Sequence, residues 1–175
     1  MKFQLHSFGE SGHSYKIALA LHFAKVDWQQ IFIDFFRGEA RSETYKNEIN
    51  TMAEVPVLVH GDKKISQSGA ILDYLHGKIG IYFGENEQER SEILRWVLWD
   101  NSRLSGSLGP TRFLMNFIPK DKKPIEVIRY LQKRNSNALS ILESHLSLHN
   151  WIAADQFSAA DLSCCSYLFY PEDFG

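Results

Sequence analysis

The stretch that begins at Val55-Pro56 constrains the fold more than any other part of the chain. Val57 and Leu58 follow the proline, and a proline beside a strand lies at its entrance or on an edge, because its nitrogen cannot donate to a sheet. A hairpin turn at Gly61-Asp62 and a polar Gln67-Ser68 pair come next. The residues after that pair are apolar at helical spacing, with one buried face. The stretch predicts two antiparallel strands that lead directly into an amphipathic helix.

Strand and helix patterns also alternate before this stretch. Strands are predicted at residues 2–7 and 28–34, and helices at residues 14–24 and 39–48. With the hairpin and helix described above, the order is β-α-β-α-β-β-α. This order is typical of a thioredoxin-like α/β domain, which we expect to occupy residues 1–80.

The second half of the chain has helical patterns and no strand pattern. Residues 86–105 and a segment that starts at Pro124 carry apolar residues at helical spacing. Residues 105–123, which contain glycines and prolines, are expected to be irregular. Residues 157–162 match a capping box with a hydrophobic staple. We therefore predict an all-α helical domain over residues 86–175, incomplete at its C-terminus.

Charge and composition argue against several classes of protein. The net charge of −2 gives no electrostatic basis for binding nucleic acid or an anionic membrane. No apolar run approaches the roughly 20 residues that span a bilayer. The two cysteines, Cys164 and Cys165, are adjacent, and a disulfide between neighbours is strained. A reducing, cytoplasmic location is therefore expected.

The loop after the first predicted strand has the sequence Ser11-Gly12-His13-Ser14. Thioredoxin-like redox proteins carry Cys-x-x-Cys at this location, and dithiol exchange requires a protein thiolate. Because both positions are serine here, intrinsic dithiol oxidoreductase activity is not expected. A serine hydroxyl and the positive end of the following helix are suited instead to stabilising the thiolate of a bound thiol.

Three features together resemble the cytosolic glutathione transferase family, in its serine- and cysteine-type classes (bacterial, theta-like or zeta-like). They are the segment with Pro56 and Gln67-Ser68, the order of the two domains, and Trp151-Ile152-Ala153 before the capping box. The resemblance covers essentially the whole chain. It implies glutathione as a co-substrate without a metal, a small hydrophobic electrophile as the second substrate, and a homodimer.

The resemblance also implies which residue is catalytic. Counting back from Ile17 puts that position at Ser11, whose hydroxyl would donate to the glutathione thiolate. Ser7 is the second choice. A purely capping role for Ser11 stays open. His13 in the same loop is an acid, a base or a residue without a catalytic role, and we favour the last.

The resemblance gives the glutathione-binding residues as Glu54, Val55, Pro56, Gln67 and Ser68. The Val55 backbone would pair with the cysteinyl unit of glutathione, before a proline that is cis in the family. Gln67 and Ser68 would hold the γ-glutamyl end.

Glu54 departs from the Lys or Gln of many relatives near the glycyl carboxylate. A glutamate there repels a carboxylate unless a cation intervenes, and Arg37, Arg41 and Lys46 are the candidates.

Further side chains were considered for the electrophile pocket, which the family fold puts between the two domains. The possible lining residues are Trp96, Trp99, Asn101, Arg103, Arg112 and Phe113. His145 and His149 have the spacing of some metal sites, but an interaction with the end of their helix is favoured.

The leading interpretation is a glutathione transferase that conjugates glutathione to small hydrophobic electrophiles. Two alternatives stay open. The same site serves a glutathione-dependent isomerase, dehalogenase or peroxidase, which fold and site alone do not separate. A non-catalytic binding or regulatory module would keep the fold and lose the chemistry.

Overall fold

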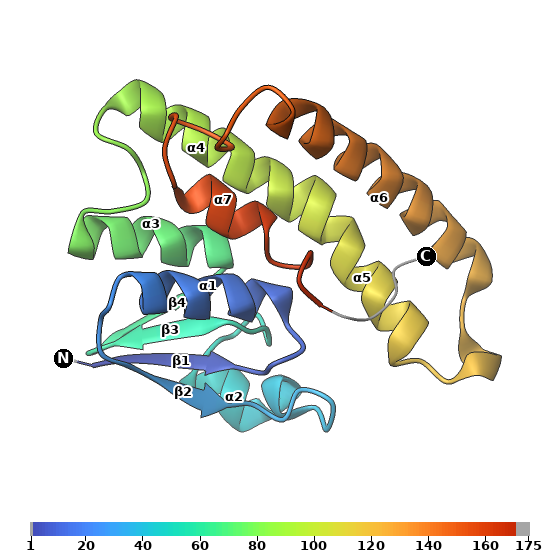
Figure 1. The fold of residues 1–175 in the computed structure, drawn as a ribbon. Helices are drawn as coiled ribbons and strands as arrows, with labels where there is room; N and C mark the ends of the chain where they lie inside the picture. Colours follow the sequence, from blue (N-terminus) through green and yellow to red (C-terminus); the bar gives the residue numbers. More distant parts are fainter. Residues whose placement is uncertain (1, 171–175) are drawn as a thin grey trace. The chain divides into compact units, whose positions relative to one another are not determined.

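The computed structural model describes residues 2–170 and divides the chain into two compact units, Met1–Tyr82 and Phe83–Gly175 (Figure 1). The prediction of an incomplete C-terminus concerns the end of the chain, and residues 171–175 lie outside the described residues. The fold class is as the sequence predicted: a thioredoxin-like sheet domain is followed by helices.

A four-stranded mixed sheet forms the centre of the first unit. Its strands are β1 (Phe3–Ser7), β2 (Trp28–Phe32), β3 (Val57–His60) and β4 (Lys63–Ser66), in the order β2-β1-β3-β4. Strand β1 is parallel to β2, while β1 and β3, and β3 and β4, are antiparallel. Leu5 on β1 is opposite Leu58 on β3, and both side chains are fully buried. The predicted hairpin is therefore confirmed.

Helices cover both faces of this sheet. Helices α1 (Gly12–Phe23) and α3 (Ser68–Ile79) lie side by side on one face, and α2 (Glu43–Glu48) lies on the other (Figure 1). A short turn, η1 (Glu39–Arg41), precedes α2. The predicted helix over residues 39–48 is thus two elements, because the Ser42 side chain caps α2 by accepting a hydrogen bond from the Tyr45 amide at 3.1 Å.

The regular secondary structure among the described residues of the second unit is all helical. Its elements are α4 (Glu87–Trp99), the π-helical turn η2 (Asp100–Leu104), α5 (Ser105–Asn116), the 3₁₀ turn η3 (Lys120–Lys122), α6 (Ile125–Leu146) and α7 (Ala159–Cys164). Helix α4 continues through η2 into α5, and α6 runs beside this long helix (Figure 1). No helix within residues 2–170 is both long and apolar enough to cross a bilayer.

The prediction of irregular structure over residues 105–123 is wrong for most of that segment. Helix α5 runs through Pro110, and its glycines are places of close packing. A Cβ atom on Gly109 would lie 2.9 Å from the Tyr167 ring, and one on Gly106 would lie 2.7 Å from the Asn101 carbonyl oxygen. Tertiary packing therefore outweighs the poor helix propensity of these residues.

The predicted capping box is confirmed at the start of α7. The Asp161 carboxylate accepts hydrogen bonds from the Ser158 amide at 2.9 Å and from the Ile152 amide at 3.0 Å. A His145 ring nitrogen lies 3.0 Å from the Ile152 carbonyl oxygen. The loop before α7 is thus tied both to its own helix and to the end of α6.

We expect acid to destabilise the first unit through His6 on β1. This residue is 8 % exposed, its Nδ1 has no hydrogen-bond partner among residues 2–170, and burial lowers its pKa below the ordinary value of 6.5. As the pH falls below 6.5, the unfolded chain takes up a proton before the folded chain does, so the free energy of unfolding decreases.

Urea unfolding from pH 7.5 down to pH 5 measures this effect, with His6→Gln as the comparison. The difference in unfolding free energy between the two proteins should change as the pH crosses about 6.5. If that difference is the same at every pH, His6 does not contribute in this way.

Candidate functional site

Ser11 lies at the point where the loop after β1 enters α1. Its Oγ caps the helix by accepting a hydrogen bond from the Ser14 amide at 3.1 Å, and its side chain is largely buried. Helix α1 therefore begins at Gly12, two residues earlier than predicted. Capping uses a lone pair of the oxygen, so the O–H group can still donate to a ligand atom. The capping role and the catalytic role are compatible.

Ser7, the second choice, is engaged inside the sheet. Its Oγ donates to the Leu5 carbonyl at 3.4 Å and accepts from the Gln30 side chain at 3.2 Å. The residue is 3 % exposed. Because its donor is already used, Ser7 is less suited than Ser11 to stabilise a bound thiolate.

The N-terminal ends of α1 and α3 meet in one place. His13 Nδ1 in the first turn of α1 lies 3.3 Å from Ser68 Oγ, the first residue of α3. Neither helix has an acidic residue in its first turn. The positive partial charges at the starts of the two helices therefore lie close together, which favours anionic ligand groups. The sequence placed Ser11 and Ser68 in separate segments, and the fold brings these segments together.

The Val55–Pro56 peptide bond is cis, as the family resemblance implied. Pro56 is buried and lies directly before β3. The Tyr45 hydroxyl at 3.1 Å and the side-chain Nδ2 of Asn50 at 3.0 Å both donate to the carbonyl oxygen of Glu54. Burial raises the pKa of Tyr45 to about 12, so its hydroxyl remains a donor at neutral pH. These two bonds hold the loop that presents the Val55 backbone.

The Glu54 side chain has an unexpected partner. Its Oε2 accepts a hydrogen bond of 2.7 Å from Gln67 Nε2. Gln67 has a φ of 68°, a left-handed conformation that is uncommon for a residue other than glycine. The Glu54 carboxylate thus anchors the side chain of a predicted ligand-binding residue whose backbone is in a restricted conformation.

The three cations considered for the glycyl carboxylate of glutathione have other neighbours in the structure. Arg37 lies 3.6 Å from Asp34, Lys46 pairs with Glu43, and the Arg41 guanidinium lies 5.7 Å from the centre of the Phe35 ring. Sequence reasoning missed the Glu54–Gln67 contact. The only available signal was that both residues belonged to the same predicted site.

The side chains that the sequence suggested for an electrophile pocket or a metal site in the second unit differ in their surroundings. Trp96 is buried, and its ring centre lies 4.5 Å from that of His145. The His145 and His149 rings also stack at 4.5 Å. Within residues 2–170, no group of three His, Cys, Asp or Glu side chains is placed to hold a metal ion. Arg112 is buried, with its guanidinium 4.0 Å from the centre of the Tyr170 ring.

Comparison with known proteins agrees with this fold. Residues 1–77 match the family model of the glutathione S-transferase N-terminal domain. The chain is 28% identical over 165 residues to the disulfide-bond oxidoreductase YfcG of Escherichia coli, covering 90% of this chain and 75% of the relative. It is 29% identical over 167 residues to glutathione S-transferase 1 of Dianthus caryophyllus, covering 92% and 73%.

Solved structures give the same result. A possible glutathione S-transferase from Rhodopseudomonas palustris is 26% identical, with a TM-score of 0.87 over 95% of this chain and 75% of the other. A glutathione transferase from Pseudomonas putida, solved with glutathione disulfide bound, has a TM-score of 0.83 at 20% identity, covering 95% and 74%. These comparisons support the cytosolic glutathione transferase family for this chain, with the N-terminal domain of that family at residues 1–77. Structural neighbours of this chain bind glutathione.

Proposed function

We propose that this chain binds glutathione at the meeting point of α1 and α3 and stabilises its thiolate for transfer to a small hydrophobic electrophile. The observation that carries this proposal is the position of Ser11, whose hydroxyl lies at the positive end of α1. A thiol with a pKa near 8.5 is only a few per cent ionised at pH 7. A decrease of about two pKa units corresponds to roughly 2.7 kcal/mol, a magnitude that one hydrogen bond and one helix end can supply.

The remaining residues would bind and orient glutathione. The Val55 backbone, next to the cis Pro56, would pair with the cysteinyl unit as an added strand does. Ser68 at the start of α3 would bind the γ-glutamyl carboxylate, and Gln67 would contact the same end of the ligand. Holding the thiolate beside the electrophile supplies the rest of the catalysis through proximity.

The direct test is the ultraviolet absorbance of the thiolate in the protein–glutathione complex, measured against pH. We expect a bound thiol pKa clearly below that of free glutathione. Binding without any decrease in the pKa would support the non-catalytic module, and absence of binding would reject the proposal.

Reduction of disulfides is a second candidate reaction, favoured by the similarity to the E. coli disulfide-bond oxidoreductase. The thiolate of bound glutathione would attack a disulfide, form a mixed disulfide with one sulfur and release the other as a thiolate. This reaction does not require cysteines at the positions of Ser11 and Ser14, because bound glutathione supplies the thiolate. Parallel assays with a chloronitrobenzene electrophile and with a small dialkyl disulfide separate the two reactions. Further assays with isomerase, dehalogenase and peroxidase substrates test the other glutathione-dependent reactions of such a site.

We expect Glu54→Ala to raise the KM for glutathione about three- to tenfold with little change in kcat, because Gln67 loses the acceptor that holds it. Glu54→Gln keeps an acceptor at this position and removes a negative charge. Its KM should therefore stay within about twofold of the original value.

Steady-state kinetics with varied glutathione measure both variants of Glu54. Glu43→Ala is the matched control, since Glu43 is exposed and pairs with Lys46 on α2. Equal KM values for Glu54→Ala and the unchanged protein would remove Glu54 from ligand positioning.

The proposal also includes the cellular compartment and the oligomeric state of the protein. Both cysteines are free, and Cys164 is buried. This fits a reducing compartment, and we propose a cytoplasmic homodimer. Size measurement in solution tests the dimer.

A further inference from the structure

His145 and His149 form a histidine pair at the C-terminal end of α6. Their rings are stacked, with centres 4.5 Å apart. His149 lies beyond Leu146, the last residue of α6, but its amide donates to the His145 carbonyl oxygen at 3.2 Å, as in a helix. The pair therefore keeps the spacing of one helical turn, and two histidines at this spacing on a helix bind zinc in some proteins.

A backbone carbonyl group fixes the orientation of the His145 ring. Nε2 of this ring lies 3.0 Å from the Ile152 carbonyl oxygen. Because a carbonyl oxygen only accepts, we assign the hydrogen of the neutral ring to Nε2, which leaves the lone pair on Nδ1. Within residues 2–170, Nδ1 makes no hydrogen bond. Histidines that bind a metal ion through one nitrogen almost always donate from the other nitrogen in this way.

The carbonyl group that holds His145 is itself held in place. Ile152 is buried, and its amide donates to the Asp161 carboxylate at 3.0 Å. The same carboxylate accepts from the Ser158 amide in the capping box of α7. A chain of hydrogen bonds thus runs from α7 to His145. The ring is therefore oriented before a ligand binds, which lowers the entropic cost of binding.

His149 provides the second nitrogen. The residue is exposed, and within the described part of the chain its ring makes no hydrogen bond. Rotation about its side-chain bonds would direct a nitrogen lone pair at an ion on His145 Nδ1. Among residues 2–170 no third His, Cys, Asp or Glu ligand is in place, so water would fill the other coordination positions.

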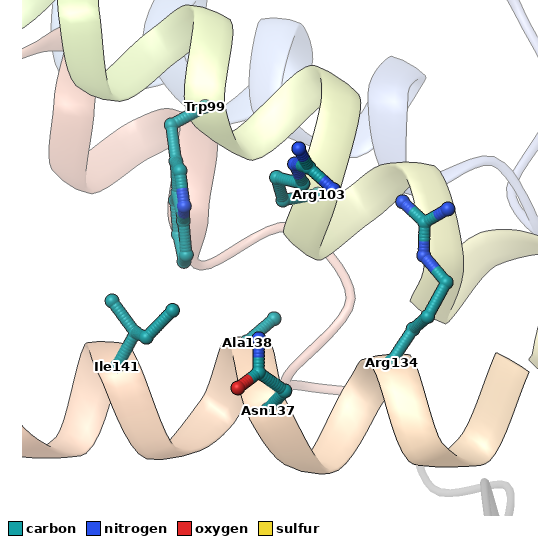
Figure 2. Close-up of a pocket in the computed structure, with 6 residues that line it drawn as sticks. All are labelled: Trp99, Arg103, Arg134, Asn137, Ala138 and Ile141. Atoms are coloured by element: carbon teal, nitrogen blue, oxygen red, sulfur yellow. The ribbon is translucent and has the colours of Figure 1, made fainter.

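Tryptophan side chains of α4 pack toward this end of α6. The Trp96 ring lies against the His145 ring, with centres 4.5 Å apart. Figure 2 shows the next turn of the same two helices, where Trp99 points from α4 toward α6 on the side of Ile141. The histidine pair is therefore next to a tryptophan whose fluorescence can report on a bound ion.

A carboxylate of α4 also acts on this region. Glu92 accepts a hydrogen bond from Trp96 Nε1 at 3.1 Å and pairs with Arg95. Hydrogen bonding from Arg95 is the main cause that keeps the pKa of Glu92 below its usual value, and the charge of His145 adds to this effect. Because Glu92 attracts a positive charge at His145, it also favours an ion bound there, while Arg95 reduces this gain.

We propose that His145 and His149 together bind a divalent transition metal ion, such as Ni²⁺, Cu²⁺ or Zn²⁺. Imidazole nitrogen suits these ions, whereas Mg²⁺ prefers oxygen ligands. The site is separate from the residues assigned to glutathione, all of which lie in the first unit. This inference does not rest on the proposed function.

Titration of the chain with Ni²⁺, without a histidine tag and without glutathione, tests the proposal. Isothermal titration calorimetry should show one ion bound per chain. Tryptophan fluorescence should fall during the same titration, because a paramagnetic ion on His145 would quench the neighbouring Trp96. His149→Gln should weaken the Ni²⁺ affinity about tenfold or more and lose the quenching.

Two further variants complete the test. His145→Gln can keep a donor to the Ile152 carbonyl but lacks the ring nitrogen, so it should weaken Ni²⁺ binding as much as His149→Gln does. His76→Gln is the matched control. His76 also lies in the last turn of a helix, α3, with a ring nitrogen 3.0 Å from a carbonyl oxygen, but the residue four positions later is Gly80. Its Ni²⁺ affinity should equal that of the unchanged protein.

Three outcomes would overturn the proposal. The first is that calorimetry detects no Ni²⁺ binding to the unchanged protein. The second is that His149→Gln binds Ni²⁺ as tightly as the unchanged protein, which would assign the ion to other side chains. The third is that Mg²⁺ competes equally well, which would show that imidazole nitrogen does not select the ion. Circular dichroism of each variant excludes unfolding as the cause of lost binding.

Discussion

Ser11→Ala should lower the turnover of glutathione with 1-chloro-2,4-dinitrobenzene at least about tenfold at pH 7, because the bound thiolate loses its hydroxyl donor. The pKa of the bound thiol should rise toward the value of free glutathione, so the loss of rate should shrink at higher pH. The KM for glutathione should change little, since the contacts proposed for Val55 and Ser68 do not involve Ser11. Turnover measured from pH 6 to pH 9 distinguishes this result from a general loss of activity.

Two further variants separate the chemical role of Ser11 from its capping role. Removing the cap of α1 should cost about 1 kcal/mol of stability. Ser158→Ala removes the equivalent cap from α7 and is the matched control, expected to lose similar stability with unchanged turnover. Ser11→Thr keeps a hydroxyl and should restore much of the rate. If Ser158→Ala loses as much turnover as Ser11→Ala, the hydroxyl of Ser11 has no special role.

The first unit could be predicted from the sequence because its signals are local. Apolar alternation and the turn at Gly61-Asp62 predicted the hairpin, and the structure has β3 and β4 there. The start of α1 was placed two residues too late, because Gly12 is a weak helix former. The Ser11 side chain compensates by capping the helix, and this contact depends on the final backbone conformation.

The second unit shows where local signals fail. Gly106, Gly109 and Pro110 predicted irregular structure, yet all three lie inside α5. A Cβ atom on Gly106 would meet the Asn101 carbonyl of the adjoining π-helical turn, and one on Gly109 would meet the Tyr167 ring. The Tyr167 contact becomes visible only when residues distant in sequence are placed next to each other.

The candidate site also combines local sequence motifs with contacts between distant segments. Its individual residues were predicted from short motifs, but their contacts cross long sequence separations. Gln67 contacts Glu54 and Ser68 contacts His13, and neither pair follows from helical or strand spacing. The sequence therefore predicted a candidate set of site residues but not the hydrogen bonds among them.

Asp100→Ala should reduce the stability of the second unit by about 3 kcal/mol. The Asp100 side chain is fully buried and accepts hydrogen bonds from Ser105 Oγ at 2.6 Å, from the Ser105 amide at 3.3 Å and from Ser163 Oγ at 2.6 Å. Ser166 extends this network through the Ser105 hydroxyl at 3.0 Å. Alanine leaves these buried donors without an acceptor and opens a cavity, so the midpoint of thermal unfolding should fall by about 6–12 °C.

Asp100→Asn distinguishes the hydrogen bonds from the volume of the side chain. Asparagine fills the same space and keeps one acceptor oxygen, so its cost should be nearer 1 kcal/mol. Urea unfolding followed by tryptophan fluorescence reports mainly on this unit, which contains three of the four tryptophans. Because Asp100 begins η2 and joins it to α5 and α7, the alanine variant should also lose the π-helical turn that carries Arg103. If the free energy of unfolding of Asp100→Ala lies within about 0.5 kcal/mol of that of the unchanged protein, the network only replaces hydrogen bonds to water. It would then not hold the turn in place.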